Sequence, residues 1–434
     1  MSAPLLPTAT ILGYPRLGRR RELKRAIESF WKGASTQADL EGVARTLRQT
    51  TRARLTGLGL PAAGGAIPES FSYYDQVLDA LVAVGAIPER FRGIDGSPLE
   101  RYFALARGDR DRQPLEMTKW FDTNYHFSVP EIDADTPFTA NAETLTALVA
   151  EAREDGVESR PVLVGPVTFL LLAKPADGAP EGLRPIDRLD ELVPVYAELL
   201  RELVAAGASW VQLDEPALVS DSLSVSREQI VALVERAYAQ LGSAEVGTER
   251  PAILLTAPYG DSSRALARLG RLPVEAVQTD LVRGSLPESA LASGELAAAF
   301  AGTQLVAGVV DGRNVWRTDS RAAFATLTRL ADAGIAVVAG TAVSLQHVPH
   351  DVDEESKLDV RLASWLAFAD QKVGQVAILA GGLAAGGDAI EVELADADAA
   401  LADRAAAPGV RDGEVRARAA AVGAADRNRA TSAD

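Results

Sequence analysis

The feature that most limits the fold is a repeated alternation of short apolar runs with longer amphipathic segments. The short runs are bounded by Gly, Pro or charged residues and lie at 8–14, 161–165, 210–213, 252–256, 274–279, 305–310 and 335–339. Helical patterns lie between or beside them at 188–207, 226–242 and 320–334. Continuous runs rich in β-branched residues are typical of strands buried on both faces. The alternation therefore predicts a parallel sheet with helical crossovers.

The number of repeats favours an α/β fold of the (β/α)8, TIM-type barrel class over an open sheet. A doubly wound open sheet is the alternative, but no G-x-G-x-x-G follows the first run. We expect the barrel to cover residues 1–385. Residues 386–434 are expected to form a helical tail or the start of an interdomain linker. A single long amphipathic helix is expected at 354–383, and residues 415–434 are expected to fray or to act as a linker.

Composition excludes several classes of function. The 434 residues include no cysteine and three histidines, and they carry a formal charge of −16. Disulfides, thiolate zinc sites and cysteine nucleophiles are therefore excluded, and we expect no metal in this chain. The acidic balance argues against nucleic-acid and anionic-membrane partners. Because no signal peptide or membrane-spanning run is recognisable, we expect a cytoplasmic protein.

A basic cluster follows the first apolar run. Residues 16–25 (RLGRRRELKR) contain six basic side chains in ten positions and begin a predicted helix. In a barrel this position is the rim, and the start of a helix offers free backbone N–H groups and a favourable dipole to an anion. The alternative is a solvated helix face with ion pairs to Glu22 and Glu28.

A second segment of unusual composition surrounds Lys119, which is one of only six lysines among 44 basic residues. Residues 116–126 (EMTKWFDTNYH) mix charged, amide, imidazole and aromatic groups with little apolar periodicity. Loops of this kind commonly bind ligands. The alternative is an ordinary surface loop anchored by Trp120 and Phe121.

Polar residues also follow the predicted strands, at 214–216, 256–259, 280–283 and 311–314. Together they resemble the ring of residues at the carboxyl ends of barrel strands. Adjacent strand residues point to opposite faces, so only one of Asp214 and Glu215 is expected to face the barrel mouth. The alternative for these carboxylates is ion pairing with arginines across the rim, namely Arg283, Arg313 and Arg317. We expect His347 to be a hydrogen-bonded structural histidine.

These segments, in this order, resemble the N-terminal half of the cobalamin-independent methionine synthase family. The resemblance rests on ILGYPRLGRRRELKRAIESFWKG, FSYYDQVLD, EMTKWFDTNYH, PVLVGPVTFLLLAKP, GASWVQLDEPALV, VVDGRNVWRTD and HVPHDVDEESKLD. It implies a protein of two face-to-face (β/α)8 barrels that transfers a methyl group from 5-methyltetrahydropteroyltriglutamate to homocysteine. In such a protein the C-terminal barrel holds a zinc ion with cysteine ligands, and this chain resembles the N-terminal barrel alone.

The resemblance also implies site residues. It assigns folate-polyglutamate binding to Arg21, Glu22, Leu23, Lys24 and Lys119, and it assigns no catalytic residue or metal ligand to this chain. The zinc is expected in the second barrel, so we expect the isolated chain to lack methyltransferase activity. The alternative is a non-catalytic folate-binding or scaffold barrel that docks on a separate zinc-bearing catalytic barrel. The sequence departs from the family pattern near the expected mouth, at 69–70, 76 and 342–346.

Overall fold

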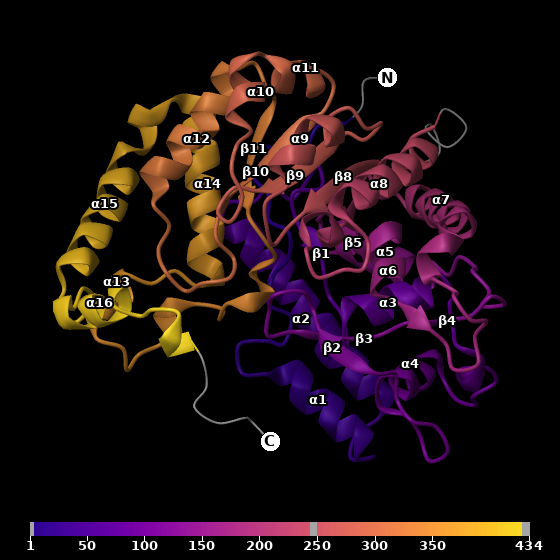
Figure 1. Ribbon diagram of the computed structural model, residues 1–434. Helices are drawn as coiled ribbons and strands as arrows, with labels where there is room; N and C mark the ends of the chain where they lie inside the picture. The colour runs from indigo at the N-terminus through magenta and orange to yellow at the C-terminus, as the bar shows by residue number, and fades with distance from the viewer. Residues whose placement is uncertain (1–3, 244–249, 428–434) are drawn as a thin grey trace.

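A curled parallel sheet forms the centre of the computed structural model, which describes residues 4–243 and 250–427 (Figure 1). Its strand order is β1-β5-β7-β8-β9-β10-β11, and every neighbouring pair is parallel. The strands are β1 (Pro68–Glu69), β5 (Arg160–Val164), β7 (Trp210–Asp214), β8 (Ala252–Ala257), β9 (Ala276–Asp280), β10 (Gln304–Val310) and β11 (Val337–Thr341). Six of these strands confirm the predicted runs to within about two residues at either end, whereas β1 was not predicted.

The N-terminal segment closes this sheet into a barrel. Ala9 bridges Ala339 of β11 in parallel, and the amide of Thr10 donates to the Ala339 carbonyl at 3.0 Å. On its other side, Thr10 Oγ1 donates to the Ala66 carbonyl at 2.7 Å, just before β1. The expected strand at 8–14 is therefore reduced to one bridge and a hydroxyl contact, but it fills the eighth position. The predicted (β/α)8 barrel is confirmed.

Helices surround the barrel (Figure 1). Helices α3 and α5 contact β5, α12 and α14 contact β10 and β11, and α7 packs against α8. The covering helices are α2 (Gln37–Gly57), α3 (Gln76–Ala83), α5 (Glu143–Glu154), α6 (Pro166–Leu172), α7 (Leu189–Ala205), α8 (Arg227–Leu241), α9 (Ser263–Leu269), α10 (Glu288–Ala292), α11 (Glu295–Ala299), α12 (Ser320–Asp332) and α14 (Ala369–Ala385). Helices α7, α8 and α12 confirm the predicted helical segments.

Smaller elements are added to this frame. An antiparallel hairpin joins β2 (Met117–Lys119) to β3 (His126–Ser128), and β4 (Glu131–Ile132) pairs in parallel with β6 (Lys174–Pro175). Helices α1 (Glu22–Trp31) and α4 (Pro98–Arg107) share a small apolar cluster with α2. Of these elements, α1 and β2 carry residues that the family resemblance singled out near positions 21 and 119.

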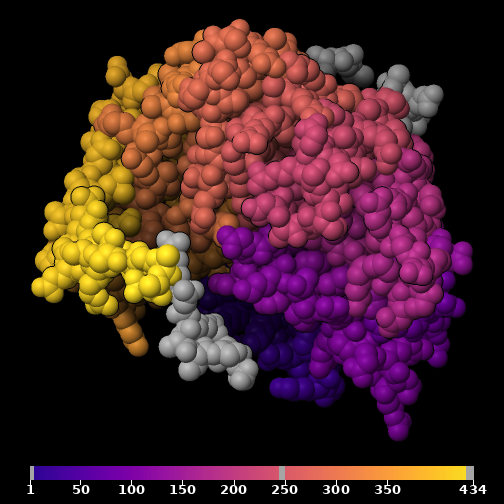
Figure 2. All heavy atoms as spheres, viewed as in Figure 1, coloured from indigo at the N-terminus to yellow at the C-terminus, as the bar shows by residue number. Residues whose placement is uncertain are grey.

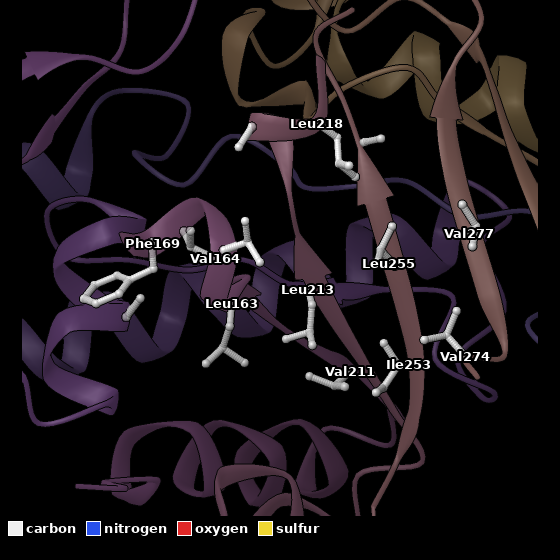
Figure 3. Packing of buried hydrophobic residues seen from close by; sticks show 14 of the residues in the cluster. Leu163, Val164, Phe169, Val211, Leu213, Leu218, Ile253, Leu255, Val274 and Val277 are labelled. Carbon is white, nitrogen blue, oxygen red and sulfur yellow. The ribbon is translucent and has the colours of Figure 1, made fainter. Parts of the chain in front are cut away.

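Two apolar layers hold the barrel together. The outer layer lies between strands and helices, where Figure 3 shows Leu163, Leu213, Leu255 and Val277 on consecutive strands. A smaller inner cluster fills the barrel itself and consists of Leu6, Leu12, Trp210, Ala252, Leu254, Ala276, Val306 and Val338. Because side chains alternate along each strand, the two clusters are the two faces of one sheet.

The expected single helix at 354–383 is wrong. The chain forms α13 (Val360–Ser364), breaks, and then forms α14. The break has a physical cause: Leu366 bridges Trp316, and the amide of Ala367 donates to the Val315 carbonyl at 2.9 Å. Pairing with another segment removes these residues from helical geometry.

The C-terminal part is helical and rests on the barrel's flank (Figure 2, yellow). Helix α14 ends at Ala385 and is followed by α15 (Glu391–Ala406) and α16 (Gly413–Ala420). Arg321 of α12 pairs with Glu391 and Asp398 of α15, each at 2.7 Å. A domain boundary after residue 385 stays a prediction, and residues 428–434 of the expected tail lie outside the described residues. In the part of the chain that is described, no helix is long and apolar enough to span a membrane.

Candidate functional site

A small pocket with a cavity volume of about 60 Å³ opens at the carboxyl ends of the strands. Four of its polar side chains come from or directly follow strands: Ser70 after β1, Asp214 at the end of β7, Tyr259 after β8 and Ser344 after β11. The other lining residues include Leu12, Gln76, Asp79, Trp120, Val162, Leu163 and Gln346. This is the face at which (β/α)8 barrels gather their ligand-binding side chains.

Asp214 and Glu215 point in opposite directions, as predicted. Asp214 lines the pocket, and its Oδ1 accepts hydrogen bonds from Gln212 Nε2 at 2.8 Å and Thr256 Oγ1 at 2.7 Å. Burial raises the pKa of Asp214 to about 6. Glu215 instead accepts the backbone amides of Val167 and Thr168 at the start of α6, at 3.2 and 2.7 Å.

The alternative of rim ion pairs does not hold for this carboxylate pair. Among the described residues, neither Asp214 nor Glu215 forms a salt bridge, and Arg313 pairs with Asp122 of the hairpin instead, at 3.0 Å. Glu215 is a structural helix cap whose pKa burial raises to about 7. Of Asp214 and Glu215, only Asp214 has its carboxylate at the mouth of the barrel.

Asp79 and Gln76 enter the pocket from α3. Asp79 Oδ1 accepts the Tyr102 hydroxyl at 2.7 Å, and burial raises its pKa to about 7. Sequence reasoning missed Asp79, although its spacing of four from Asp75 places both on one face of a helix. Gln76 and Gln346, two of the departures from the family pattern, both line the pocket, so their predicted position near the mouth is confirmed.

The Lys119 hairpin covers one side of the pocket. Lys119 ends β2, is exposed and pairs in register with His126. The next residue, Trp120, is buried, and its Nε1 donates to the Tyr259 hydroxyl at 3.1 Å. Phe121 stacks on Tyr259 with ring centroids 6.2 Å apart. The two expected anchors therefore do fix the hairpin, and they fix it to the pocket wall.

Asp75 fixes the other end of the hairpin. Its Oδ1 accepts the amides of Val77 and Leu78 at the start of α3, while its Oδ2 accepts both the amide and the hydroxyl of Ser128 on β3, at 3.0 and 2.9 Å. One buried carboxylate thus joins a helix start to the hairpin strand. Asp75, the first aspartate of the FSYYDQVLD segment, therefore has a structural role.

The resemblance-derived residues near position 21 occupy the first turn of α1. Arg21 is the N-cap and has a left-handed backbone with φ of 60°; Lys24 is exposed and lies 3.7 Å from Glu28. The Leu23 side chain is fully buried, so only its backbone is available to a ligand. Glu22 Oε2 accepts the Arg20 amide at 2.9 Å.

Backbone amides at this helix start are less available than the sequence suggested. The amides of Arg21 and Leu23 donate to the carbonyls of Gly18 and Leu17, at 3.0 and 3.1 Å. An anion here is therefore held by side chains more than by the helix terminus. Among the described residues, Arg20, Arg21 and Arg25 form no ion pair, so their charges are not neutralised by a direct partner.

Two members of the basic cluster have other roles. Arg19 pairs with Asp370 of α14 at 2.8 Å, and Arg54 pairs with the same carboxylate at 2.8 Å. Arg16 donates to Gln346 Oε1 at 3.3 Å and lies 5.7 Å from the centre of the Tyr125 ring. Arg16 thereby links the chain leading to α1 with the Lys119 hairpin, although no contact between Lys119 and the α1 residues is found in the described chain.

His347 is hydrogen-bonded, as predicted, and its structural role stays a prediction. Its Nε2 lies 2.9 Å from the Tyr259 hydroxyl, and burial, with the charges of Arg313 and Arg16, lowers its pKa to about 4. It is neutral at pH 7. Within residues 4–243 and 250–427, no group of three or more His, Asp or Glu side chains is arranged to hold a metal ion.

A closed parallel barrel with its pocket and polar side chains at the carboxyl ends of the strands defines a (β/α)8 barrel protein with a ligand site at that face. Residues 8–334 match the family described as cobalamin-independent synthase, N-terminal domain. The chain belongs to this family, and the resemblance drawn from sequence segments is confirmed.

Relatives with curated names agree. A 5-methyltetrahydropteroyltriglutamate–homocysteine methyltransferase of Mycolicibacterium paratuberculosis is 49% identical over 95% of this chain and 52% of its own length. The enzyme of the same name from Streptomyces coelicolor is 46% identical over 97% of this chain and 53% of its own length. The chain thus spans about half the length of the curated relatives it matches.

Solved structures support the fold. A protein of Listeria monocytogenes assigned as a vitamin-B12-independent methionine synthase superposes with a TM-score of 0.56 at 14% identity, over 88% of this chain and 99% of that chain. A B12-independent methionine synthase from a Shewanella species, solved with selenomethionine, gives a TM-score of 0.53 at 14% identity, over 91% and 98%. At this identity the likeness concerns the barrel architecture alone.

Proposed function

We propose that this chain is the folate-polyglutamate-binding half of a system that transfers a methyl group from 5-methyltetrahydropteroyltriglutamate to homocysteine. The observation that carries the proposal is the group of Arg20, Arg21 and Arg25 at the start of α1, which form no ion pair with any described residue. In a protein of charge −16, such a group is a local anion site rather than part of a general positive surface. The names of the relatives supply the anion: a tail of three glutamates.

The chemistry of the two proposed contact regions suits such a tail. Arg21 is able to hold a carboxylate through two parallel hydrogen bonds, whereas Lys24 and Lys119 act as compact point charges. Both lysines are exposed, so each contact is expected to contribute about 1 kcal/mol or less and to weaken with salt. Glu22 serves by holding the Arg20 amide and so shaping the turn.

Calorimetry tests this proposal. We expect the chain to bind triglutamylated 5-methyltetrahydrofolate more tightly than the monoglutamate, with an affinity that falls as salt rises. Lys24→Ala and Lys119→Ala should each weaken triglutamate binding severalfold. Lys32→Ala is the matched control, because Lys32 is also exposed but lies at the opposite end of α1. Equal affinity for the two folates would contradict the proposal.

We also propose that homocysteine activation takes place outside this chain, on a zinc ion held by a second barrel. The described residues offer no metal-ligating group, and the sequence has no cysteine to act as a thiolate ligand. We expect no methionine from the chain supplied with zinc and both substrates, and activity when the C-terminal half of a relative is added. Activity of the chain alone would contradict this. The cytoplasmic location and the lack of nucleic-acid and membrane partners stay predictions.

A further inference from the structure

The pocket at the barrel mouth differs in charge from the basic cluster on α1. Asp79 and Asp214 line the pocket, and none of the described residues that line it is Lys, Arg or His. A polyglutamate tail carries only carboxylates in its side chains, so this pocket repels the ligand that α1 attracts. The two regions therefore suit ligands of opposite charge.

The carboxylate of Asp214 has a fixed orientation and one oxygen without a hydrogen-bond donor among the described residues. Its Oδ1 accepts two hydrogen bonds, from Gln212 and Thr256, and both fix its orientation. No donor within the described chain reaches its Oδ2. Arg160 lies beneath it in the barrel, but the guanidinium donates to neutral acceptors, Gln212 Oε1 at 3.0 Å and the Ile11 carbonyl at 2.9 Å, and forms no ion pair. Asp214 is half-buried and lines the pocket, so this oxygen is open to a donor or cation that enters it.

Aromatic faces and apolar side chains complete the pocket. Trp120 and Tyr259 form one wall, and the hydrogen bond between them fixes both rings. Leu12, Ala80 and Leu163 add apolar side chains to the lining of the same pocket. Aromatic faces attract cations, most strongly where water is excluded. Ser70, Gln76, Ser344 and Gln346 add uncharged hydrogen-bonding groups around the same space.

We propose that this pocket is a second binding site, separate from the basic cluster on α1, and that it takes a small organic cation: an ammonium or guanidinium group on a short aliphatic body. The charged group meets Asp214 Oδ2 and faces Trp120 and Tyr259, while the aliphatic body contacts the apolar floor. Arg160 below and Arg16 at the rim limit the negative potential, so the site selects a single positive charge. The inference does not depend on polyglutamate binding.

Fluorine NMR of the full chain labelled with 5-fluorotryptophan tests the proposal. The five tryptophans give separate reporters, and Trp120→Phe assigns the one in the pocket. We expect n-propylammonium and N-methylguanidinium to shift the Trp120 signal saturably at millimolar concentration. Propionate and 1-propanol have the same body without the positive charge, and they should leave this signal in place.

Variants separate charge from shape. Asp214→Asn keeps an oxygen that accepts from Gln212 and Thr256 but loses the charge, and it should weaken cation binding by about tenfold or more. Asp79→Asn should act in the same direction, and it provides the test if the first variant fails to fold. Asp221→Asn, at an exposed carboxylate outside the pocket, is the control. A Trp120 shift caused equally by 1-propanol, no shift with either cation, or full binding by both pocket variants would overturn the proposal.

Discussion

Trp120 Nε1 donates a hydrogen bond to the Tyr259 hydroxyl at 3.1 Å, and this contact joins residues that are 139 positions apart. An indole N–H can only donate, so the hydroxyl oxygen accepts this bond, and the same hydroxyl is hydrogen-bonded to His347 Nε2, 2.9 Å away. A single hydroxyl thus connects the Lys119 hairpin, the end of β8 and the segment after β11.

Tyr259→Phe tests how much the two hydrogen bonds of the Tyr259 hydroxyl stabilise the fold. The variant keeps the ring and the left-handed backbone (φ of 80°) but leaves the Trp120 and His347 nitrogens without their shared partner. We expect the free energy of unfolding to fall by about 2 kcal/mol in urea titrations, because buried polar groups lose their bonds. Tyr125→Phe, which loses one bond to the Gln346 carbonyl, should cost about 1 kcal/mol. Equal losses of unfolding free energy in Tyr259→Phe and Tyr125→Phe would contradict a larger contribution from the Tyr259 hydroxyl, which has two partners.

Asp75→Asn tests the second anchor of the hairpin. An asparagine has one acceptor oxygen, so it cannot serve both the α3 amides and Ser128. We expect a loss of about 2–3 kcal/mol in unfolding free energy, and faster hydrogen exchange at the β2–β3 hairpin amides. Ser128→Ala removes only the hydroxyl bond and should cost about 1 kcal/mol. Unchanged hairpin exchange in Asp75→Asn would show that Trp120 alone holds the hairpin.

The barrel could be predicted because its strands are buried on both faces. Residues such as Val211, Leu255 and Val277 belong to continuous apolar runs, which can be recognised in one sequence without its relatives. Strand β1 left no such signal, because it has only two residues, Pro68 and Glu69, which are too few to form a continuous apolar run. The expected long helix failed for a different reason: pairing between Trp316 and Leu366 depends on tertiary structure that local periodicity does not contain.

The site was predicted only where charge or composition is unusual. Asp214, the basic cluster and the Lys119 segment were found for this reason, and alternation along the strand separated Asp214 from Glu215. Asp79 was missed because it lies in an apolar helix whose pattern indicates only packing. No local pattern showed that its side chain would share a pocket with Asp214, since that proximity arises from closure of the barrel.

Glu215→Gln tests the pH dependence of the helix cap. Burial raises the Glu215 pKa from its ordinary value of 4.5 to about 7, so the folded protein binds this proton more tightly than the unfolded chain. The resulting stability is present below pH 4.5 and is lost as the pH rises to about 7. Glutamine has no charge to bury but only one acceptor oxygen for the two α6 amides, so we expect the variant to be less stable than the parent at pH 4.5. This deficit should shrink by up to about 3 kcal/mol as the pH rises to about 7. If the unfolding free energies of the variant and the parent changed in parallel with pH, the raised pKa of Glu215 would be contradicted.

Arg21→Gly tests whether a strained residue is retained for binding. Arg21 has φ of 60°, which costs a residue with a Cβ about 1–2 kcal/mol and costs glycine little. After the greater entropy of glycine in the unfolded chain is subtracted, we expect a gain of about 1 kcal/mol in unfolding free energy. Triglutamate affinity should fall severalfold in the same variant, because the guanidinium is gone. Arg20→Gly is the matched control: its φ is not in the left-handed region, so it should lose about 0.5–1 kcal/mol instead. If Arg21→Gly were more stable and still bound the triglutamate with the parent's affinity, the strain at Arg21 would need an explanation other than ligand binding.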